Sequence, residues 1–240
     1  AFAPFGLWPA VVVGLALAYW VMRDVTDWRS GFFRGWLIGV GKYAVGASWI
    51  YVSIHEQGGA SSALAGVLVG VFVAGMALFS AIFGALYGLV NSAVLSSDND
   101  QQPSFEATLA VGLRVVLFAA SWLVAEWCLT WLLTGFPWLF AGYGLMGTWL
   151  EGYAPVTGVL GLSAIGCVFA GLFVECSVAG ISVKSKCSIV AACALLVIAG
   201  FGFTKVQWVA LGERQQVALV QGNIEQITKW NAITFIVLAL

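Results

Sequence analysis

The sequence predicts an all-α polytopic membrane protein with about six transmembrane helices, and three observations carry this prediction. Of the 240 residues, 61% are hydrophobic and only 9% are charged, whereas soluble domains carry roughly 25% charged residues. Several uncharged runs reach the length of about 20 residues that one helix needs to cross a bilayer. The alternation of polar and apolar residues that is typical of a membrane β-barrel is absent.

Six hydrophobic spans follow from these runs, and each can satisfy its own backbone as a helix. The third span belongs to an uncharged run from Gln57 to Ser97 that contains no proline, so we expect one long or tilted helix there. The predicted transmembrane region covers 1–210, with spans at 6–22, 35–54, 63–93, 107–133, 156–180 and 188–209.

Glycines recur at four-residue spacing inside these spans. This spacing lets membrane helices approach each other closely, so we interpret these glycines as helix-packing residues. The sets are Gly31, Gly35 and Gly39, then Gly66 and Gly70, then Gly84 and Gly88.

Basic residues are concentrated in alternate connections between spans. The connections at 56–62 and 134–155 contain no Lys or Arg. The positive-inside rule therefore predicts that the basic connections face the cytoplasm and that whatever follows Trp208 is extracytoplasmic. The basic residues after the first span and between the fifth and sixth are Arg23, Arg29, Arg34, Lys184 and Lys186.

Glu126 is the first candidate for function, because an ionisable group inside a span costs several kcal/mol unless it is paired or hydrated. A structural carboxyl bonded to a neighbouring helix is an equally good interpretation. Glu175 and Lys42 lie nearer the span ends, where we expect them to snorkel and to be structural. His55, at the outer edge of the second span, is either a titratable group facing a substrate or an amphipathic cap.

The remaining composition excludes several classes of ligand. The net charge is −1 and no basic run is present, so nucleic-acid binding is not expected. The five cysteines form no CxxC pair and no histidine lies at ligand spacing, so we predict no metal site and no cofactor. We interpret the cysteines as small apolar packing residues.

Two further segments differ from the spans. In TGFPWLFAGYG (134–144, called the outer loop below), Gly135 and Pro137 break the helix while aromatic residues keep the loop apolar, as expected at the membrane interface. The segment QVALVQGNIEQITKW (216–230) begins like a short β-strand followed by a Gly-Asn turn. It predicts that an extracytoplasmic domain begins at about 211–232.

Five phrases in this order, AFAPFGLWP, SWIYVSIHEQGG, TGFPWLFAGYG, GYAPVTGVLG and VALVQGNIEQITKW, resemble the bacterial apolipoprotein N-acyltransferase family over nearly the whole chain. The resemblance implies seven helices, a periplasmic α/β nitrilase-like domain and a last helix. The first helix would then precede Ala1, and the nitrilase-like domain would begin near 216–230. Residues would be missing between Ala232 and Ile233, so that 233–240 is a remnant of the last helix.

The resemblance also implies an activity. The family takes an acyl chain from a membrane phospholipid through a cysteine thioester and gives it to the α-amino group of a diacylglyceryl-cysteine apolipoprotein. This is the final step of lipoprotein maturation in the bacterial inner membrane. The family's Glu-Lys-Cys triad lies in the nitrilase-like domain, so no catalytic residue is expected in this chain, which would be inactive alone. We expect a monomer in the lipid bilayer.

Some residues match family positions directly. Trp230 matches a tryptophan beside the family's active site, which implies substrate positioning. Leu129 stands where family members commonly have an arginine, so the resemblance supplies no charge partner for Glu126. The outer-loop residues that border lipid access in the family are matched by Phe136, Pro137, Trp138 and Tyr143.

Two other classes of function remain. A transporter or channel could use Glu126, Glu175 and Lys42 along a polar path, although no internal repeat and no pair of broken helices in matching halves supports it. A noncatalytic membrane scaffold is the other alternative.

Overall fold

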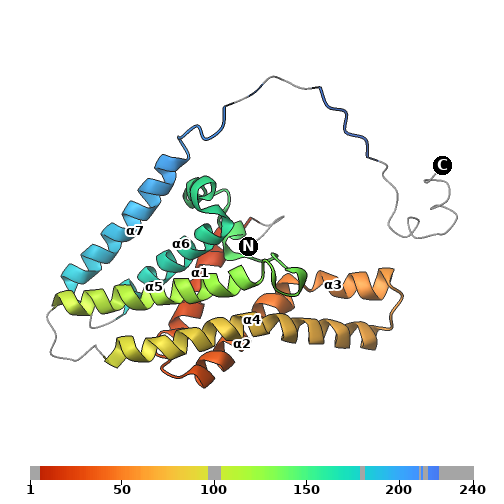
Figure 1. Ribbon diagram of the computed structural model, residues 1–240, viewed down its shortest axis with the longest axis horizontal. Coiled ribbons are helices and arrows are strands. Elements are labelled where there is room, and N and C mark those ends of the chain that lie inside the picture. Colours follow the sequence, from red (N-terminus) through yellow and green to blue (C-terminus); the bar gives the residue numbers. More distant parts are fainter. Residues whose placement is uncertain (1–5, 97–103, 179–181, 211, 213–215, 222–240) are drawn as a thin grey trace.

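The computed structural model describes residues 6–96, 104–178, 182–210, 212 and 216–221, and over these residues its regular structure is entirely helical (Figure 1). The long helices are α1 (Trp8–Met22), α2 (Trp28–Gly46), α4 (Ser62–Ser96), α5 (Ser104–Cys128), α6 (Ala154–Ser177) and α7 (Val183–Phe203). The short ones are α3 (Trp49–Val52), the π-helix η1 (Ser53–Gln57) and the 3-10 turns η2 (Leu132–Thr134), η3 (Ala141–Leu145) and η4 (Trp149–Tyr153).

The helices confirm the predicted class, an all-α membrane domain. Four described helical segments are long and apolar enough to cross a bilayer, and α2 with α3 and η1, bent by 52°, makes a fifth. Helix α1 has 15 residues and is therefore about 22 Å long. It is shorter than a hydrocarbon core of about 30 Å, so the first predicted span, 6–22, is a helix but not a full crossing by length.

Several helix ends differ from the predicted span ends. Helix α2 begins at Trp28, not near residue 35, because the Asp27 carboxylate accepts a hydrogen bond from the Ser30 N–H at 2.8 Å and caps the helix. That bond also lowers the pKa of Asp27. Helix α5 ends at Cys128, not near residue 133, because the backbone turns through Leu133 and Thr134 with positive φ.

Helices α2 and α4 pack against each other in antiparallel directions through glycines. A Cβ on Gly35 would collide with the Ser80 carbonyl, and one on Gly39 would lie 2.8 Å from the Ala77 Cα. Gly31 and Gly84 are in equally close backbone contact. The packing prediction is confirmed for the sets that begin at Gly31 and Gly84. Gly66 and Gly70 make no such contact with the part of the chain that the structure describes, because a Cβ on either would meet nothing there within 4 Å.

An aromatic core joins α1, α4 and α5. Phe118 is fully buried, and its ring meets Tyr19 edge-on at 5.2 Å and Phe83 edge-on at 5.4 Å between centroids. Trp122 packs on both phenylalanines at 5.2 and 6.0 Å. Edge-to-face pairs of this kind stabilise a core beyond the area they bury.

The two ends of the bundle differ in charge. One end of the bundle, which we call the basic end, holds the α1–α2 connection, the last turns of α4 and α6 and the first turns of α5 and α7 (Figure 1). Helix α3 and the outer loop lie at the other end. This arrangement agrees with the pattern behind the predicted orientation, in which the basic end faces the cytoplasm. The basic end carries Arg23, Arg29, Arg34, Lys184 and Lys186.

The predicted strand at 216–220 is not formed. Gln216 to Gln221 have no regular secondary structure and no ladder partner among the described residues, and Leu219 is 95% exposed. A strand needs a neighbouring strand for its hydrogen bonds, and the described part of the chain offers none. Trp230 and 233–240 lie outside the described residues, so the domain boundary near 211–232 stays a prediction.

Candidate functional site

Glu126 joins α5 to the outer loop. Its side chain is 2% exposed, and its Oε1 accepts hydrogen bonds from the Trp122 indole N–H and from the Ala141 backbone N–H, both at 2.9 Å. Trp122 stands one helical turn before Glu126, so the helix itself brings the indole to the carboxylate. The second oxygen, Oε2, is buried and has no hydrogen-bond partner among the described residues.

Lys42 of α2 supplies the positive charge beside this carboxylate. Its Nζ lies 3.8 Å from Glu126 Oε1 and 5.4 Å from the ring centroids of both Tyr43 and Trp122. The Lys42 side chain is only 18% exposed, so the prediction that it snorkels is wrong. The physical reason is that a buried carboxylate is strongly destabilised without a cation, and Lys42 is placed to provide one.

A small cavity of about 10 Å³ separates these groups from α4. Lys42, Glu126 and Leu129 line it together with Ser80 and Phe83. Leu129 is 2% exposed and follows Glu126 by three residues, so its side chain reaches the same carboxylate environment from α5. The charge partner that the sequence could not supply at position 129 therefore comes from α2.

The outer loop is held at three backbone points. The Phe136 N–H donates to the Leu129 carbonyl at 2.7 Å, the Ala141 N–H donates to Glu126, and the Gly142 N–H donates to Ser163 Oγ of α6 at 2.8 Å. Between these points Leu139 has φ of 60°, which is uncommon for a residue with a branched side chain. The loop conformation is thus imposed by its anchors and not by local preference.

Leu139 fills a space that Gly46 leaves open. A Cβ on Gly46 would collide with the Leu139 side chain, so the end of α2 and the outer loop fit only because residue 46 has no side chain. Helix α2 ends at this position and the chain turns by 52° into α3 and η1. The bend and the loop therefore pack as one unit.

Four aromatic rings form a continuous row across this end of the bundle. Trp49 of α3 stacks on Trp138 at 5.1 Å, Trp138 stacks on Phe136 at 5.4 Å, and Phe136 meets Phe72 of α4 edge-on at 5.5 Å. We call these four residues the aromatic row. Trp138 and Trp49 are 48% and 45% exposed, so the row presents two indoles to the surroundings, as is usual at a membrane interface.

The other predicted site residues are placed differently. Tyr143 is exposed and stacks on the buried Phe140 at 5.8 Å, while Pro137, which stands between Phe136 and Trp138 in the sequence, is exposed. His55 Nδ1 lies 2.7 Å from the Ala60 carbonyl and its ring is 5.5 Å from Tyr51. These His55 contacts are local to η1 and the turn after it, which is the arrangement that the amphipathic-cap interpretation predicts.

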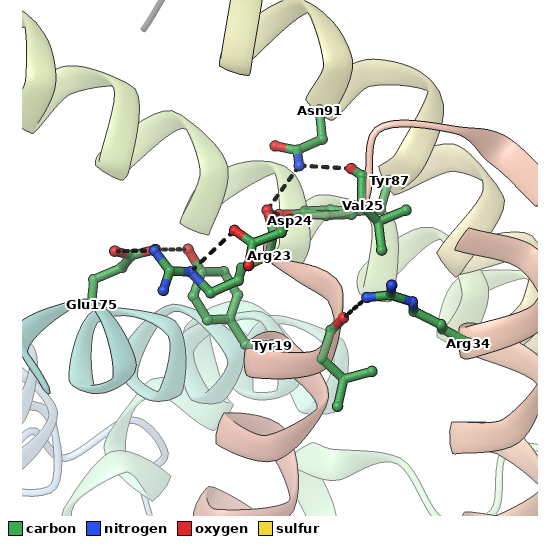
Figure 2. Close-up of polar contacts among 9 residues, drawn as sticks. Tyr19, Arg23, Asp24, Val25, Arg34, Tyr87, Asn91 and Glu175 are labelled. Carbon is green, nitrogen blue, oxygen red and sulfur yellow. Dashed lines mark hydrogen bonds and ion pairs between the residues drawn. The ribbon is translucent and has the colours of Figure 1, made fainter. Parts of the chain in front are cut away.

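A second polar cluster lies at the basic end (Figure 2). Glu175 of α6 is completely buried, its Oε1 accepts a 2.6 Å hydrogen bond from the Tyr19 hydroxyl, and its Oε2 lies 3.6 Å from the Arg23 guanidinium. Glu175 therefore does not snorkel, because Tyr19 of α1 and Arg23, the residue that follows α1, hold its carboxylate inside the bundle. Arg23 also lies 3.8 Å from Asp24, whose side chain is 74% exposed.

Sequence reasoning missed the residues that bind the α1–α2 turn. The Asn91 side-chain amide of α4 donates to the carbonyls of Arg23 and Val25 at 2.9 and 2.8 Å, and Arg34 donates to the Val21 carbonyl at 2.7 Å (Figure 2). These bonds satisfy carbonyls at the end of α1, which a helix leaves without partners. The signal available in the sequence was an asparagine inside an otherwise apolar run. In the structure Asn91 is fully buried.

We predict that Glu175→Ala lowers the free energy of unfolding by about 3 kcal/mol, because it leaves Arg23 and the Tyr19 hydroxyl without their buried partner. Asp24→Ala is the matched control, since an exposed ion pair contributes less than about 1 kcal/mol. Reversible unfolding of the purified protein in mixed detergent measures both changes. Equal effects from the two variants would contradict a structural role for the buried pair.

The chain is similar to known proteins over most of its length. A family model described as the apolipoprotein N-acyltransferase N-terminal domain matches residues 1–172. Proteins named apolipoprotein N-acyltransferase are similar over almost the entire chain. They include those of Pseudomonas syringae pv. tomato (40% identical, 96% of this chain), Azotobacter vinelandii (39%, 95%) and Coxiella burnetii (36%, 98%).

The matches cover a similar share of each relative's own length. They cover 43% of the Pseudomonas syringae protein, 42% of the Azotobacter protein and 45% of the Coxiella protein. The chain thus spans less than half the length of the curated relatives it matches. Glu126, Lys42, the outer loop and the aromatic row all fall inside the range matched by the family model.

Proposed function

This chain belongs to the apolipoprotein N-acyltransferase family, and on that basis we propose that it is the membrane domain of an enzyme that N-acylates lipoproteins. The enzyme would transfer an acyl chain from a membrane phospholipid to the α-amino group of the diacylglyceryl-cysteine at the start of an apolipoprotein. The family match over residues 1–172 is the observation that carries this proposal.

The bond-forming chemistry would take place outside the membrane domain. In the family the acyl chain passes through a cysteine thioester in a nitrilase-like domain, and a carboxylate and a lysine assist as general base and oxyanion donor. Cys167 is fully buried in the hydrophobic core of the membrane domain. We therefore assign the membrane domain the task of bringing two lipidic substrates to the height of that domain.

The outer loop would be the surface that meets these substrates. Both substrates combine acyl chains with a polar head, and the aromatic row combines apolar ring faces with two exposed indoles. Such surfaces are favourable where one end of a ligand is apolar and the other is hydrated. Phe136, Pro137, Trp138 and Tyr143 would border lipid access, and Trp230 would position substrate beside the active site.

The proposed place of action is the bacterial inner membrane, with the outer-loop end toward the periplasm. The basic connections gathered at the opposite end support this orientation. The transporter alternative has less support, because Glu126 and Glu175 are engaged in separate clusters at opposite ends of the bundle. The proposed partners are the phospholipid donor, the apolipoprotein acceptor and the surrounding bilayer, with the protein acting as a monomer.

The experiment is phospholipid-dependent N-acylation of a diacylglyceryl peptide by the full-length protein in proteoliposomes, followed by mass spectrometry of the peptide. We expect Trp138→Ala to lower kcat/KM about tenfold, an effect of about 1.4 kcal/mol, because it interrupts the aromatic row. Trp131→Ala is the matched control: Trp131 is also exposed, and its ring contact among the described residues is with Trp127 at 5.3 Å, outside the aromatic row. It should change the rate less than twofold.

Two results would overturn the proposed function. One is the absence of any acylated peptide with the wild-type protein when both lipidic substrates are present. The other is solute flux across the same liposomes without acyl transfer, which would favour a transporter. Equal losses in Trp138→Ala and Trp131→Ala would remove the aromatic row from the proposal.

A further inference from the structure

An apolar groove runs between α1 and α2 beneath the outer loop. Its volume is about 400 Å³, within the range of about 300–1,000 Å³ that is usual for small-molecule sites. Leu15 of α1 and Ile38 of α2 form its walls, and Leu139 of the outer loop covers one end. Val45, at its rim, is 79% exposed, so the groove opens toward the surroundings of the bundle.

Two glycines leave the floor of this groove open. Gly14 of α1 and Gly41 of α2 both line it, and a Cβ on either would meet no atom within 4 Å. These glycines therefore differ from Gly35 and Gly39, whose missing side chains are required for contact with α4. The absence of side chains at 14 and 41 keeps space free that no described residue occupies.

Lys42 is the charged residue among those that line the groove. Its ammonium group has three N–H donors, but within the described residues it makes one ion pair at 3.8 Å and no hydrogen bond within 3.5 Å. Donors that are withdrawn from water and left without acceptors are unfavourable. An occupant with an oxygen acceptor at this point would satisfy them.

The level of Lys42 in the bundle indicates which acceptor would be present. Lys42 precedes the end of α2 at Gly46 by four residues, or about 6 Å along the helix axis. Beyond that end lies the stacked pair of Trp49 and Trp138, and tryptophans gather at the headgroup level. Lys42 therefore lies just inside the headgroups, where the ester carbonyls of glycerophospholipids begin the hydrocarbon region.

We propose that this groove binds one acyl chain of a glycerophospholipid, whose ester carbonyl oxygen accepts a hydrogen bond from Lys42 Nζ. The chain would lie along Gly14 and Gly41, and the headgroup would lie beside the aromatic row. Only the further step, that this bound lipid is the acyl donor, rests on the proposed function. A packed protein helix fits less well, because its backbone carbonyls are already used within the helix.

The experiment uses the full-length protein in nanodiscs that contain a phosphatidylethanolamine with a photoreactive diazirine in one acyl chain. After irradiation, mass spectrometry locates the labelled peptides. We expect labelling of α1 and α2 in the wild type, and about a tenfold reduction in Gly41→Leu or Gly14→Leu, because a leucine would take the place of the acyl chain. Gly75→Leu is the matched control: Gly75 is an exposed glycine of α4 with nothing within 4 Å of its missing Cβ.

Labelling that is equally strong in Gly41→Leu and in Gly75→Leu would overturn the proposal, since ordinary boundary lipid would then explain it. Absence of label from α1 and α2 in the wild type would also overturn it, and would mean that another segment of the full-length protein covers the groove. N-acylation is measured on the same samples. Labelling without acylation supports the groove and counts against the proposed function, whereas acylation without labelling overturns the groove alone.

Discussion

Substituting Gly35 by valine is expected to lower the free energy of unfolding by about 3 kcal/mol or more, by forcing α2 away from α4. A Cβ at this position would collide with the Ser80 backbone carbonyl, which cannot turn aside as a side chain can. The neighbouring contacts at Gly31 and Gly39 are equally close. Separation at one point would therefore loosen the whole helix pair, including the face of α2 that carries Lys42.

The expected result is a lower yield of folded full-length protein and a lower unfolding midpoint in detergent for Gly35→Val, with Gly35→Ala between it and the wild type. Gly70→Val is the control, because Gly70 belongs to the same sequence pattern on α4 but meets nothing within 4 Å. It should change the free energy of unfolding by less than about 0.5 kcal/mol, as substitutions away from packed features do. Similar losses at positions 35 and 70 would show that the valine side chain disturbs the helices themselves.

Glycine spacing alone could not distinguish Gly35, which contacts a neighbouring helix, from Gly70, which does not. The four-residue repeat places glycines on one face of a helix, but it carries no information on whether another helix lies against that face. Gly31, Gly35 and Gly39 of α2 contact α4. Gly66 and Gly70 lie on a face of α4 against which no described residue packs within 4 Å. The partner of a helix is a property of the tertiary fold, and this is where the sequence pattern ceased to be informative.

Helix existence was easier to predict than helix length. Long uncharged runs form helices in lipid because the backbone has no other partner for its hydrogen bonds, and all six predicted spans coincide with helices. The ends were harder to predict because they depend on local capping. The Asp27–Ser30 hydrogen bond starts α2 inside the predicted basic connection after the first span. The hydrogen bond from the Phe136 N–H to the Leu129 carbonyl closes the turn after α5.

The candidate site was predicted in its parts but not in its connections. Composition and depth singled out Glu126, and the Gly-Phe-Pro-Trp sequence singled out the outer loop. The hydrogen bond from the Ala141 N–H of the outer loop to Glu126 could not be predicted, since it depends on how the loop folds back on α5. Lys42 was assigned to the interface because it lies near a span end, whereas the fold places it beside a buried carboxylate.

Removing the charge of Lys42 is expected to affect both stability and the proposed activity. In Lys42→Ala the buried Glu126 carboxylate keeps its two N–H donors but loses its cation, and breaking a buried pair of this kind costs about 3–5 kcal/mol. The carboxylate would then take up a proton or move, and the outer loop would shift with it. A displacement of about 1 Å near a reaction centre can lower the rate about a hundredfold.

Moving the charge to the other side of the same carboxylate should reverse much of this loss. Leu129 lines the small cavity with Lys42 and Glu126, and an arginine there lies one turn from the carboxylate on the same helix face. We therefore expect Lys42→Ala combined with Leu129→Arg to recover at least half of the lost free energy of unfolding, and N-acylation with it. Leu129→Arg alone should destabilise the protein, because a cavity of about 10 Å³ cannot accept a guanidinium while Lys42 remains.

The control for this exchange separates charge from volume. Lys42→Ala combined with Leu129→Met refills part of the space that the lysine leaves but supplies no cation, so it should remain as impaired as Lys42→Ala alone. Unfolding in detergent and peptide N-acylation in proteoliposomes are measured for all four variants and the wild type. If methionine at position 129 restores as much as arginine, then the Lys42 side chain acts by packing, and Glu126 holds the outer loop without needing a charge beside it.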